Sequence, residues 1–357
     1  MMNMHSEDTF RYMNELGKQR EPFLFILDFD LAKPLVFPLH SLENSAEIVF
    51  NINGQRNFTP LSRKSSKTVF FHKKPVLYTD YKAKFDFVLE NLQFGNSFLV
   101  NLTQPTAIET NLSLFEIFHS CTAKYKLLVD TETDKFVVFS PEPFVKINEQ
   151  GVISSFPMKG TIDAGIDNAE IKLMNDVKEQ AEHATIVDLI RNDLSQVATN
   201  VRVERYRFVE RVKTHDKELL QVSSKISGQL PSDYLEKIGD IFQKLLPAGS
   251  ISGAPKPKTV EIIKKAEGYE RGYYTGIVGI FDGKRLDSGV MIRFIEQNTN
   301  QKAQSTEGVF IFKSGGGITA MSDAESEYLE MIDKVYVPII TRNIAHRQRS
   351  VATCEMA

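Results

Sequence analysis

Two pairs of glutamates have the spacing of helical neighbours. Glu179 and Glu182 lie three residues apart, and so do Glu327 and Glu330. Residues at this spacing share one face of a helix, so two such faces that meet would surround a space with carboxylates. Oxygen ligands of this kind suit Mg²⁺, which often binds through one or two carboxylates together with its substrate. Taken alone, either pair is better explained as a solvated helix face.

A lysine and two glycine-rich segments are the other candidates for chemistry. Lys159 stands in a turn at 156–161, where a lone lysine is usually solvated. The segment 314–317 follows an expected strand and precedes an expected helix. Its backbone N–H groups are placed to hold an anion, although a flexible connection explains the glycines equally well. The glycines of 246–256 suggest either close backbone approach or a rigid turn.

The elements that must position these groups mix strands and helices without strict alternation. Strands are predicted, from runs rich in Phe, Val and Ile, at 23–29, 47–53, 67–71, 124–130, 135–140, 201–209, 219–226, 276–281, 288–295 and 308–313. Helices are predicted, from apolar periodicity and capping residues, at 80–91, 113–119, 168–190, 234–244 and 323–335. This mixture favours an α+β fold over a doubly wound sheet.

The composition is ordinary for a water-soluble protein. The 357 residues are 42% hydrophobic and carry a net charge of −3, which gives no general attraction to nucleic acid. The longest apolar runs are far too short to span a bilayer, and the first residues lack a signal-peptide pattern. Cys121 and Cys354 show no metal or disulfide spacing. We therefore expect a cytoplasmic protein without nucleic-acid or membrane partners.

Several separated motifs occur in a definite order along the chain. They are SPEPF at 140–144, PMKGT at 157–161, AEH at 181–183 with VDLIRNDL at 187–194, the loop 249–256, IR at 292–293, SGGG at 314–317 and EYLE at 327–330. In residues and order they resemble the chorismate-utilising enzymes, strongly over 141–335 and weakly at 95–103. The resemblance implies large antiparallel sheets packed as a β-sandwich with helices outside.

The resemblance also implies one chorismate-binding catalytic domain over 1–340. Within it, 106–340 form the catalytic core, and 1–105 match the family only weakly. The polar segment 341–357 is expected to be a frayed tail.

Within this family, the residue at position 159 separates two reactions. Anthranilate synthases carry Ala there, whereas aminodeoxychorismate synthases commonly carry Lys. The resemblance therefore favours conversion of chorismate and ammonia to 4-amino-4-deoxychorismate, on the route to 4-aminobenzoate and folate. Leu99 stands where relatives that add water carry a Lys base and where many amine-transferring relatives carry Gln, and it argues against isochorismate or salicylate synthesis.

The resemblance assigns the catalytic roles as follows. Lys159 attacks C2 of chorismate as a covalent nucleophile, and burial is expected to lower its pKa so that it is neutral. Glu142 is the general acid for the departing 4-hydroxyl. Glu182 and Glu330 bind Mg²⁺ directly, and Glu179 and Glu327 act mainly through metal-bound water.

The remaining implied residues contact the substrate. Those at the enolpyruvyl carboxylate are Arg293 and Tyr274, together with backbone groups near Gly315 and Gly317. Other implied contacts are Gly160, Thr161, Ser250 and Gln221. Many relatives have His where Gln221 stands, and Gln cannot shuttle a proton near pH 7.

The sequence also bears on the source of the ammonia. The sequence contains no recognisable Cys/His glutaminase constellation, so ammonia is expected from solution or from a separate glutamine amidotransferase subunit. One alternative is anthranilate synthase component I, which Lys159 opposes. The other is a non-catalytic chorismate-binding subunit, which Gln221 and Leu99 favour slightly and Glu142 opposes.

Overall fold

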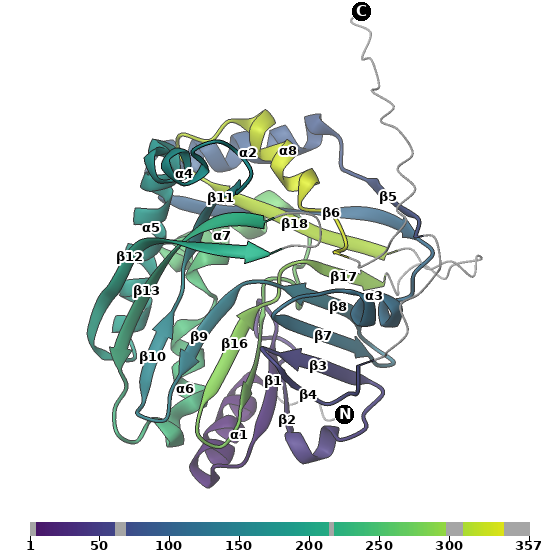
Figure 1. The fold of residues 1–357 in the computed structure, drawn as a ribbon, viewed down its shortest axis with the longest axis vertical. Helices are drawn as coiled ribbons and strands as arrows, with labels where there is room; N and C mark the ends of the chain where they lie inside the picture. Colours follow the sequence, from purple (N-terminus) through teal and green to yellow (C-terminus); the bar gives the residue numbers. More distant parts are fainter. Residues whose placement is uncertain (1–4, 61–68, 214–217, 298–309, 339–357) are drawn as a thin grey trace, which may run out of the picture.

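The computed structural model describes residues 5–60, 69–213, 218–297 and 310–338. Within these ranges the strands form two nine-stranded sheets, and neighbouring strands run antiparallel (Figure 1). The first sheet has the order β11 (Met158–Asp163), β13 (Glu218–Gln229), β10 (Val152–Ser155), β9 (Pro143–Ile147), β16 (Leu286–Val290), β15 (Ile277–Phe281), β1 (Phe23–Leu27) and β2 (Leu35–Pro38), with β12 (Thr199–Lys213) paired to β13.

The second sheet is built around one long strand pair, β6 and β18. Its order is β14 (Gly253–Ala254), β6 (Leu99–Thr110), β18 (Phe310–Ile318), β17 (Phe294–Gln297), β8 (Lys135–Ser140), β7 (Tyr125–Asp130), β3 (Ile48–Ile52) and β4 (Gln55–Arg56), with β5 (Phe71–Lys74) paired to β6.

Helices cover the outer faces of the two sheets. The α-helices are α1 (Ser6–Gln19), α2 (Tyr78–Gln93), α3 (Leu114–Ser120), α4 (Ala169–Asn175), α5 (Val177–Ser195), α6 (Ile238–Leu245), α7 (Lys256–Glu267) and α8 (Ala324–Asp333). Short 3₁₀ turns are η1 (Leu39–Leu42), η2 (Tyr234–Lys237) and η3 (Gly249–Ile251). In Figure 1, α1 and α6 lie side by side near β1, whereas α2 and α8 lie at the opposite end near β18.

Strand β1 shows why the sheets pack face to face. All five of its residues are buried and apolar, and successive side chains of a strand point to opposite faces. Leu24 and Ile26 belong to the core between the sheets, which also contains residues of β3, β7 and β8. Phe23 and Phe25 pack instead with α1 and α6, and the ring of Phe25 meets that of Phe242 at 4.7 Å. The predicted α+β sandwich with outer helices is thus confirmed.

The prediction of one helix over 168–190 is wrong in one respect, because the helix is interrupted at Asp176. Helix α4 ends at Asn175, and Asp176 adopts an extended conformation with φ −66° and ψ 112°. Its carboxylate accepts the N–H of Glu179 at 3.0 Å, so it serves as the N-cap of α5. Short polar side chains favour caps over helix interiors because they bind nearby backbone groups.

The predicted strand over 288–295 is also divided. β16 ends at Val290 and β17 begins at Phe294, and between them Arg293 has a φ of 55°. A left-handed residue interrupts the regular extended backbone of a strand, and at this point the chain passes from the first sheet into the second.

Several expectations fall at the limits of the described residues. The predicted frayed tail 341–357 lies outside them, as do parts of the predicted strands 67–71 and 308–313. Helix α1 and strands β6 and β9 were not predicted. Among the described residues, no helix combines the length and hydropathy that a membrane span requires.

Candidate active site

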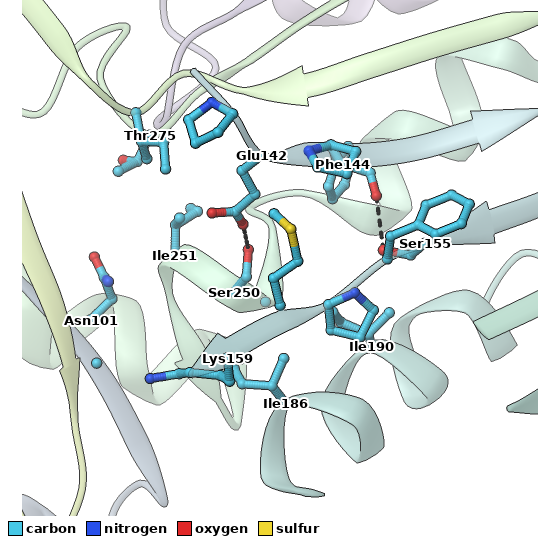
Figure 2. Close-up of a pocket in the computed structure, with 18 of the residues that line it drawn as sticks. Asn101, Glu142, Phe144, Ser155, Lys159, Ile186, Ile190, Ser250, Ile251 and Thr275 are labelled. Carbon is cyan, nitrogen blue, oxygen red and sulfur yellow. Dashed lines mark hydrogen bonds between the residues drawn. The ribbon is translucent and has the colours of Figure 1, made fainter. Parts of the chain in front are cut away.

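A cavity of about 280 Å³ brings the predicted site residues together. The second-sheet strand β18 forms one wall, β11 and β13 of the first sheet form another, and η3 closes part of the space. The predicted residues that line it are Glu142, Lys159, Gly160, Thr161, Gln221, Ser250, Tyr274, Arg293, Gly315, Gly317 and Glu330. Glu179, Glu182 and Glu327 do not line it. Glu182 pairs with Lys159, and Glu327 contacts Lys178. Figure 2 shows Glu142 and Lys159 reaching into this cavity from different segments of the chain.

Glu142 lies where β8 leaves one sheet and β9 enters the other. Its N–H donates to Ser140 Oγ at 3.2 Å, which fixes the turn. Ser250 Oγ on η3 donates to Glu142 Oε1 at 2.9 Å (Figure 2). Burial raises the pKa of Glu142, and the opposing effects of Ser250, Arg293 and Lys159 do not cancel this rise. A carboxyl group with a raised pKa retains its proton to higher pH, as a general acid requires.

Lys159 lies in strand β11, and its ammonium group pairs with a buried glutamate. Nζ is 2.5 Å from Glu182 Oε2, and the side chain is 26% exposed. Burial lowers the pKa of Lys159, but attraction to Glu182, Glu179 and Glu330 outweighs burial and the net direction is upward. The prediction of a lowered pKa is therefore wrong for this arrangement, because it weighed burial without the three carboxylates.

Three of the four predicted metal ligands, Glu182, Glu327 and Glu330, are paired with lysines of the chain. Lys178 Nζ lies 3.8 Å from Glu182 Oε1 and 3.5 Å from Glu327 Oε1, so it joins α5 to α8. Glu330 pairs with Lys334 at 2.7 Å. In the described part of the chain, no three His, Cys, Asp or Glu side chains converge into a ready metal site.

The donor set nevertheless suits Mg²⁺. All four groups offer oxygen, the ligand that Mg²⁺ prefers. Glu179 Oε2 is buried without a hydrogen-bond partner in the described structure, and a buried acceptor of this kind is costly unless it finds a donor or cation. Two helices bring the carboxylates close enough for one Lys178 to contact both sides. These residues therefore fit a divalent cation that replaces lysine contacts.

The glycines at 315–317 do not form the loop predicted from sequence. They lie inside β18, where Gly315 stands opposite Thr103 and Gly317 opposite Asn101 of β6. β17 accompanies β18 only as far as Lys313, so the glycines have a strand on one side only. The neighbouring strand β6 explains why glycine is needed at position 315, because a Cβ on Gly315 would lie 2.3 Å from the Leu102 carbonyl oxygen.

The direction of the glycine N–H groups follows from the hydrogen bonds of the residues opposite them on β6. Asn101 N–H donates to the Ser252 carbonyl and Thr103 N–H donates to Glu267, so neither bonds a glycine. In antiparallel ladders such non-hydrogen-bonded pairs alternate with bonded ones. The N–H groups of Gly315 and Gly317 therefore point away from β6, towards the unpaired edge. The N–H groups predicted to bind an anion therefore lie on a strand edge instead of in a loop.

Arg293 and Tyr274 both line the cavity. Tyr274 is buried, and Arg293 Nε is buried without a hydrogen-bond partner in the described structure. A buried guanidinium donor without a partner suits a planar carboxylate, which can accept two N–H groups at once. Thr161 and Gln221 stand opposite each other on β11 and β13, so both face the cavity from one wall.

Three cavity residues carried no role in the sequence analysis. Asn101 and Thr275 line the cavity from β6 and from the turn before β15 (Figure 2). Lys334 also lines it, with Nζ 2.9 Å from the Gly315 carbonyl oxygen. The spacing of Glu330 and Lys334, four apart at the end of an expected helix, was the available signal for this lysine.

Replacing Gly317 by alanine is expected to weaken substrate binding without unfolding the protein. The new Cβ would lie 3.1 Å from Leu99 Cδ1 and 3.9 Å from Lys159 Nζ, within the cavity wall. We expect the KM for the substrate to rise about tenfold while the melting temperature stays near that of the wild type. Gly315→Ala is the contrast, because its Cβ meets backbone and should lower the melting temperature. Equal effects of the two variants on KM and melting would contradict this view.

The profile of the family described as chorismate binding enzyme matches residues 39–339. A PabA-like protein of Haemophilus influenzae is 51% identical over 328 residues, which cover 91% of this chain and 95% of that protein. Aminodeoxychorismate synthase component 1 of Salmonella typhimurium is 32% identical over 269 residues, which cover 72% of this chain and 56% of that protein. The family match and the match to the Haemophilus influenzae protein both extend over most of this chain.

Solved structures share the fold at low sequence identity. The menaquinone-specific isochorismate synthase of Escherichia coli has a TM-score of 0.67 at 15% identity, covering 94% of this chain and 82% of that one. Anthranilate synthase component I of Streptococcus pneumoniae has a TM-score of 0.64 at 20% identity, covering 87% and 79%. At these identities the likeness bears on the fold alone.

Proposed function

This chain belongs to the chorismate-binding enzymes, and from that premise we propose that it converts chorismate and ammonia to 4-amino-4-deoxychorismate through a covalent adduct on Lys159. The observation that carries the proposal is the placement of Lys159 and Glu142 in one cavity. A nucleophile and an acid on different walls can act on two positions of one ring. The similarity to an aminodeoxychorismate synthase component supports the same reaction.

The first step forms a bond between Lys159 Nζ and C2 of chorismate. The ring double bonds shift, the C4–O bond breaks, and the proton of Glu142 leaves with the oxygen as water. In the second step ammonia attacks C4, the double bonds shift back, and the C2–N bond breaks to release Lys159. The proton that the incoming nitrogen loses restores Glu142, so one ammonia enters and one water leaves in each cycle.

The other residues hold the substrate for these steps. Arg293 and Tyr274, with the N–H groups of Gly315 and Gly317, would bind the enolpyruvyl carboxylate at one end of the cavity. Glu182 and Glu330 would hold Mg²⁺, with Glu179 and Glu327 behind them. When bound, Mg²⁺ would hold the ring carboxylate and neutralise the glutamates that keep the pKa of Lys159 high.

We further propose that the ammonia comes from a glutamine amidotransferase subunit or from solution, in the cytoplasm. Cys121 is buried in the core, and burial raises the pKa of its thiol to about 12. Such a thiol is a poor nucleophile, so Cys121 is unsuited to glutamine hydrolysis. Product from glutamine should therefore require an added glutaminase, whereas product from ammonium salts should not.

Chorismate turnover is expected to fall at alkaline pH as Glu142 loses its proton. The active acid is protonated and burial raises its pKa, so activity is present below this pKa and is lost as the pH rises through it. Ser250→Ala removes a hydrogen-bond donor that favours the ionised carboxylate of Glu142. The variant should therefore move the alkaline limb of the pH–activity profile to higher pH. The measurement is kcat/KM against pH at constant free ammonia. A limb that moves to lower pH in Ser250→Ala would contradict the role of Glu142.

Removing Lys178 is expected to tighten Mg²⁺ binding. Its ammonium group contacts Glu182 and Glu327 and therefore competes with a cation for them. Because the side chain is 44% exposed, solvent screens the effect, and we expect Lys178→Ala to lower the Mg²⁺ concentration for half activity about two- to fivefold. Lys265→Ala, which removes an exposed lysine from α7, is the control. Weaker Mg²⁺ binding in Lys178→Ala would argue against these ligands.

Identification of the product tests the proposed reaction against its nearest alternative. Anthranilate synthases are also similar to this chain, at 32% identity over 261 residues for one from Haloarcula marismortui. Such an enzyme eliminates pyruvate after amination, so anthranilate and pyruvate formed from chorismate, Mg²⁺ and ammonium would refute the proposal. No turnover at all would favour a non-catalytic chorismate-binding subunit.

A further inference from the structure

A fully buried ion pair lies directly behind the cavity wall. Arg271, in the turn after α7, and Glu267, at the end of α7, are each 1% exposed as side chains. Arg271 Nε donates to Glu267 Oε2 at 2.9 Å, and Nη2 donates to Glu267 Oε1 at 2.6 Å. A buried ion pair by itself is weak evidence for stability, so its other contacts decide what it does.

The remaining donors of Arg271 reach three different segments. Nη1 donates to the Ile251 carbonyl at 2.8 Å and to Thr275 Oγ1 at 3.3 Å, and Nη2 donates to the Asn101 carbonyl at 2.7 Å. Ile251, Thr275 and Asn101 all line the cavity, and Figure 2 shows them on one side of it. A guanidinium with all five donors engaged holds its partners in a fixed geometry that an ammonium group cannot reproduce.

Glu267 extends these contacts to the glycine strand. Its Oε1 accepts both the N–H and the hydroxyl of Thr103, each at 2.8 Å. Thr103 stands opposite Gly315, so Glu267 holds β6 at the residue that faces this glycine. The pair thus contacts β6 beside both glycines whose N–H groups face the cavity.

We propose that Arg271, neutralised by Glu267, is a positioning residue that sets the distance between the walls of the cavity. Ile251 follows Ser250, which donates to Glu142, so the contact to the Ile251 carbonyl places the hydroxyl that holds the acid. The contact to the Asn101 carbonyl holds β6, the strand that pairs with the glycines of β18. Arg271 does not line the cavity and acts through these residues. The inference rests on the proposed function for its catalytic consequences only.

The test compares Arg271→Lys with wild-type enzyme and with Glu261→Gln, which alters an exposed pair on the same helix. Arg271→Lys keeps the charge but lacks the fork, and displacement of reacting groups by about 1 Å can cost about 100-fold in rate. We expect kcat for chorismate to fall about 100-fold, with a smaller change in KM. The alkaline limb should move upward, as in Ser250→Ala, because Ser250 no longer holds Glu142. Glu261→Gln should leave all of these unchanged.

Hydrogen exchange provides a second readout that needs no turnover. Arg271→Lys should speed amide exchange at 99–104 and 249–252, with the rest of the chain unchanged. If Arg271→Lys does not fold, Glu267→Gln should give the same local pattern, because it weakens the same contacts. Wild-type kcat and pH profile in the variant, or exchange that rises uniformly, would overturn the proposal. A wild type without turnover would refute the proposed function alone, and local exchange would then decide whether Arg271 positions the walls.

Discussion

Replacing Lys159 by alanine is expected to abolish formation of 4-amino-4-deoxychorismate. The methyl group cannot bond to C2, and the remaining site offers ammonia no activated intermediate. We expect turnover to fall at least about a thousandfold. The measurement is the initial rate of product formation from chorismate, Mg²⁺ and ammonium.

Mass spectrometry of the intact protein gives this prediction a direct chemical readout. Wild-type enzyme with chorismate and Mg²⁺ but without ammonia should gain the mass of chorismate less one water, on Lys159. Lys178→Ala is the matched control, because Lys178 contacts the same Glu182 but does not line the cavity. It should still form the adduct, whereas Lys159→Ala should not. Normal turnover in Lys159→Ala would refute the covalent mechanism.

Replacing Glu142 by glutamine should have the second largest effect. Glutamine can accept the hydrogen bond from Ser250, but it has no acidic proton for the departing hydroxyl. A positioned general acid typically contributes 10²–10⁴-fold, so we expect kcat to fall by about this factor with KM nearly unchanged. The alkaline limb of the pH profile should disappear with the carboxyl group.

The comparison with Ser250→Ala separates acid chemistry from wall geometry. That variant retains the carboxyl group, and its kcat should fall about tenfold or less, since only one hydrogen bond is removed. If Glu142→Gln kept wild-type kcat and the same alkaline limb, another group would have to supply the proton.

Local patterns in the sequence were sufficient for elements that are apolar on both faces. Strands β1 and β8 appear as short hydrophobic runs, and in the sandwich one face of each meets the other sheet while the opposite face meets a helix. The helix break at Asp176 was also visible in principle, because the side chain that caps α5 is a strong N-cap type.

Elements stabilised by distant polar contacts were not predictable in this way. Strand β6 buries Thr103, Gln104 and Thr106. Thr103 is satisfied by Glu267 and Tyr269, which lie 164 and 166 residues away in sequence. The glycines at 315–317 have low strand propensity, yet they pair with β6, and at Gly315 a Cβ would collide with the backbone of that strand. Neither contact follows from local spacing.

The site itself was found through motif order more than through residue spacing. Lys159 alone was best explained as a solvated lysine in a turn, and the family resemblance gave it a role. The raised pKa of Lys159 depends on Glu182, Glu179 and Glu330, which only tertiary structure brings near it. Lys178 and Arg271 escaped notice for the same reason.

The most direct test of the amine-transfer proposal is a product chromatogram from the purified full chain. Chorismate, Mg²⁺ and ammonium should give 4-amino-4-deoxychorismate, with one ammonia consumed per chorismate and no release of pyruvate. Glutamine should replace ammonium only when a glutaminase subunit is added. Anthranilate or isochorismate as the product would contradict the account.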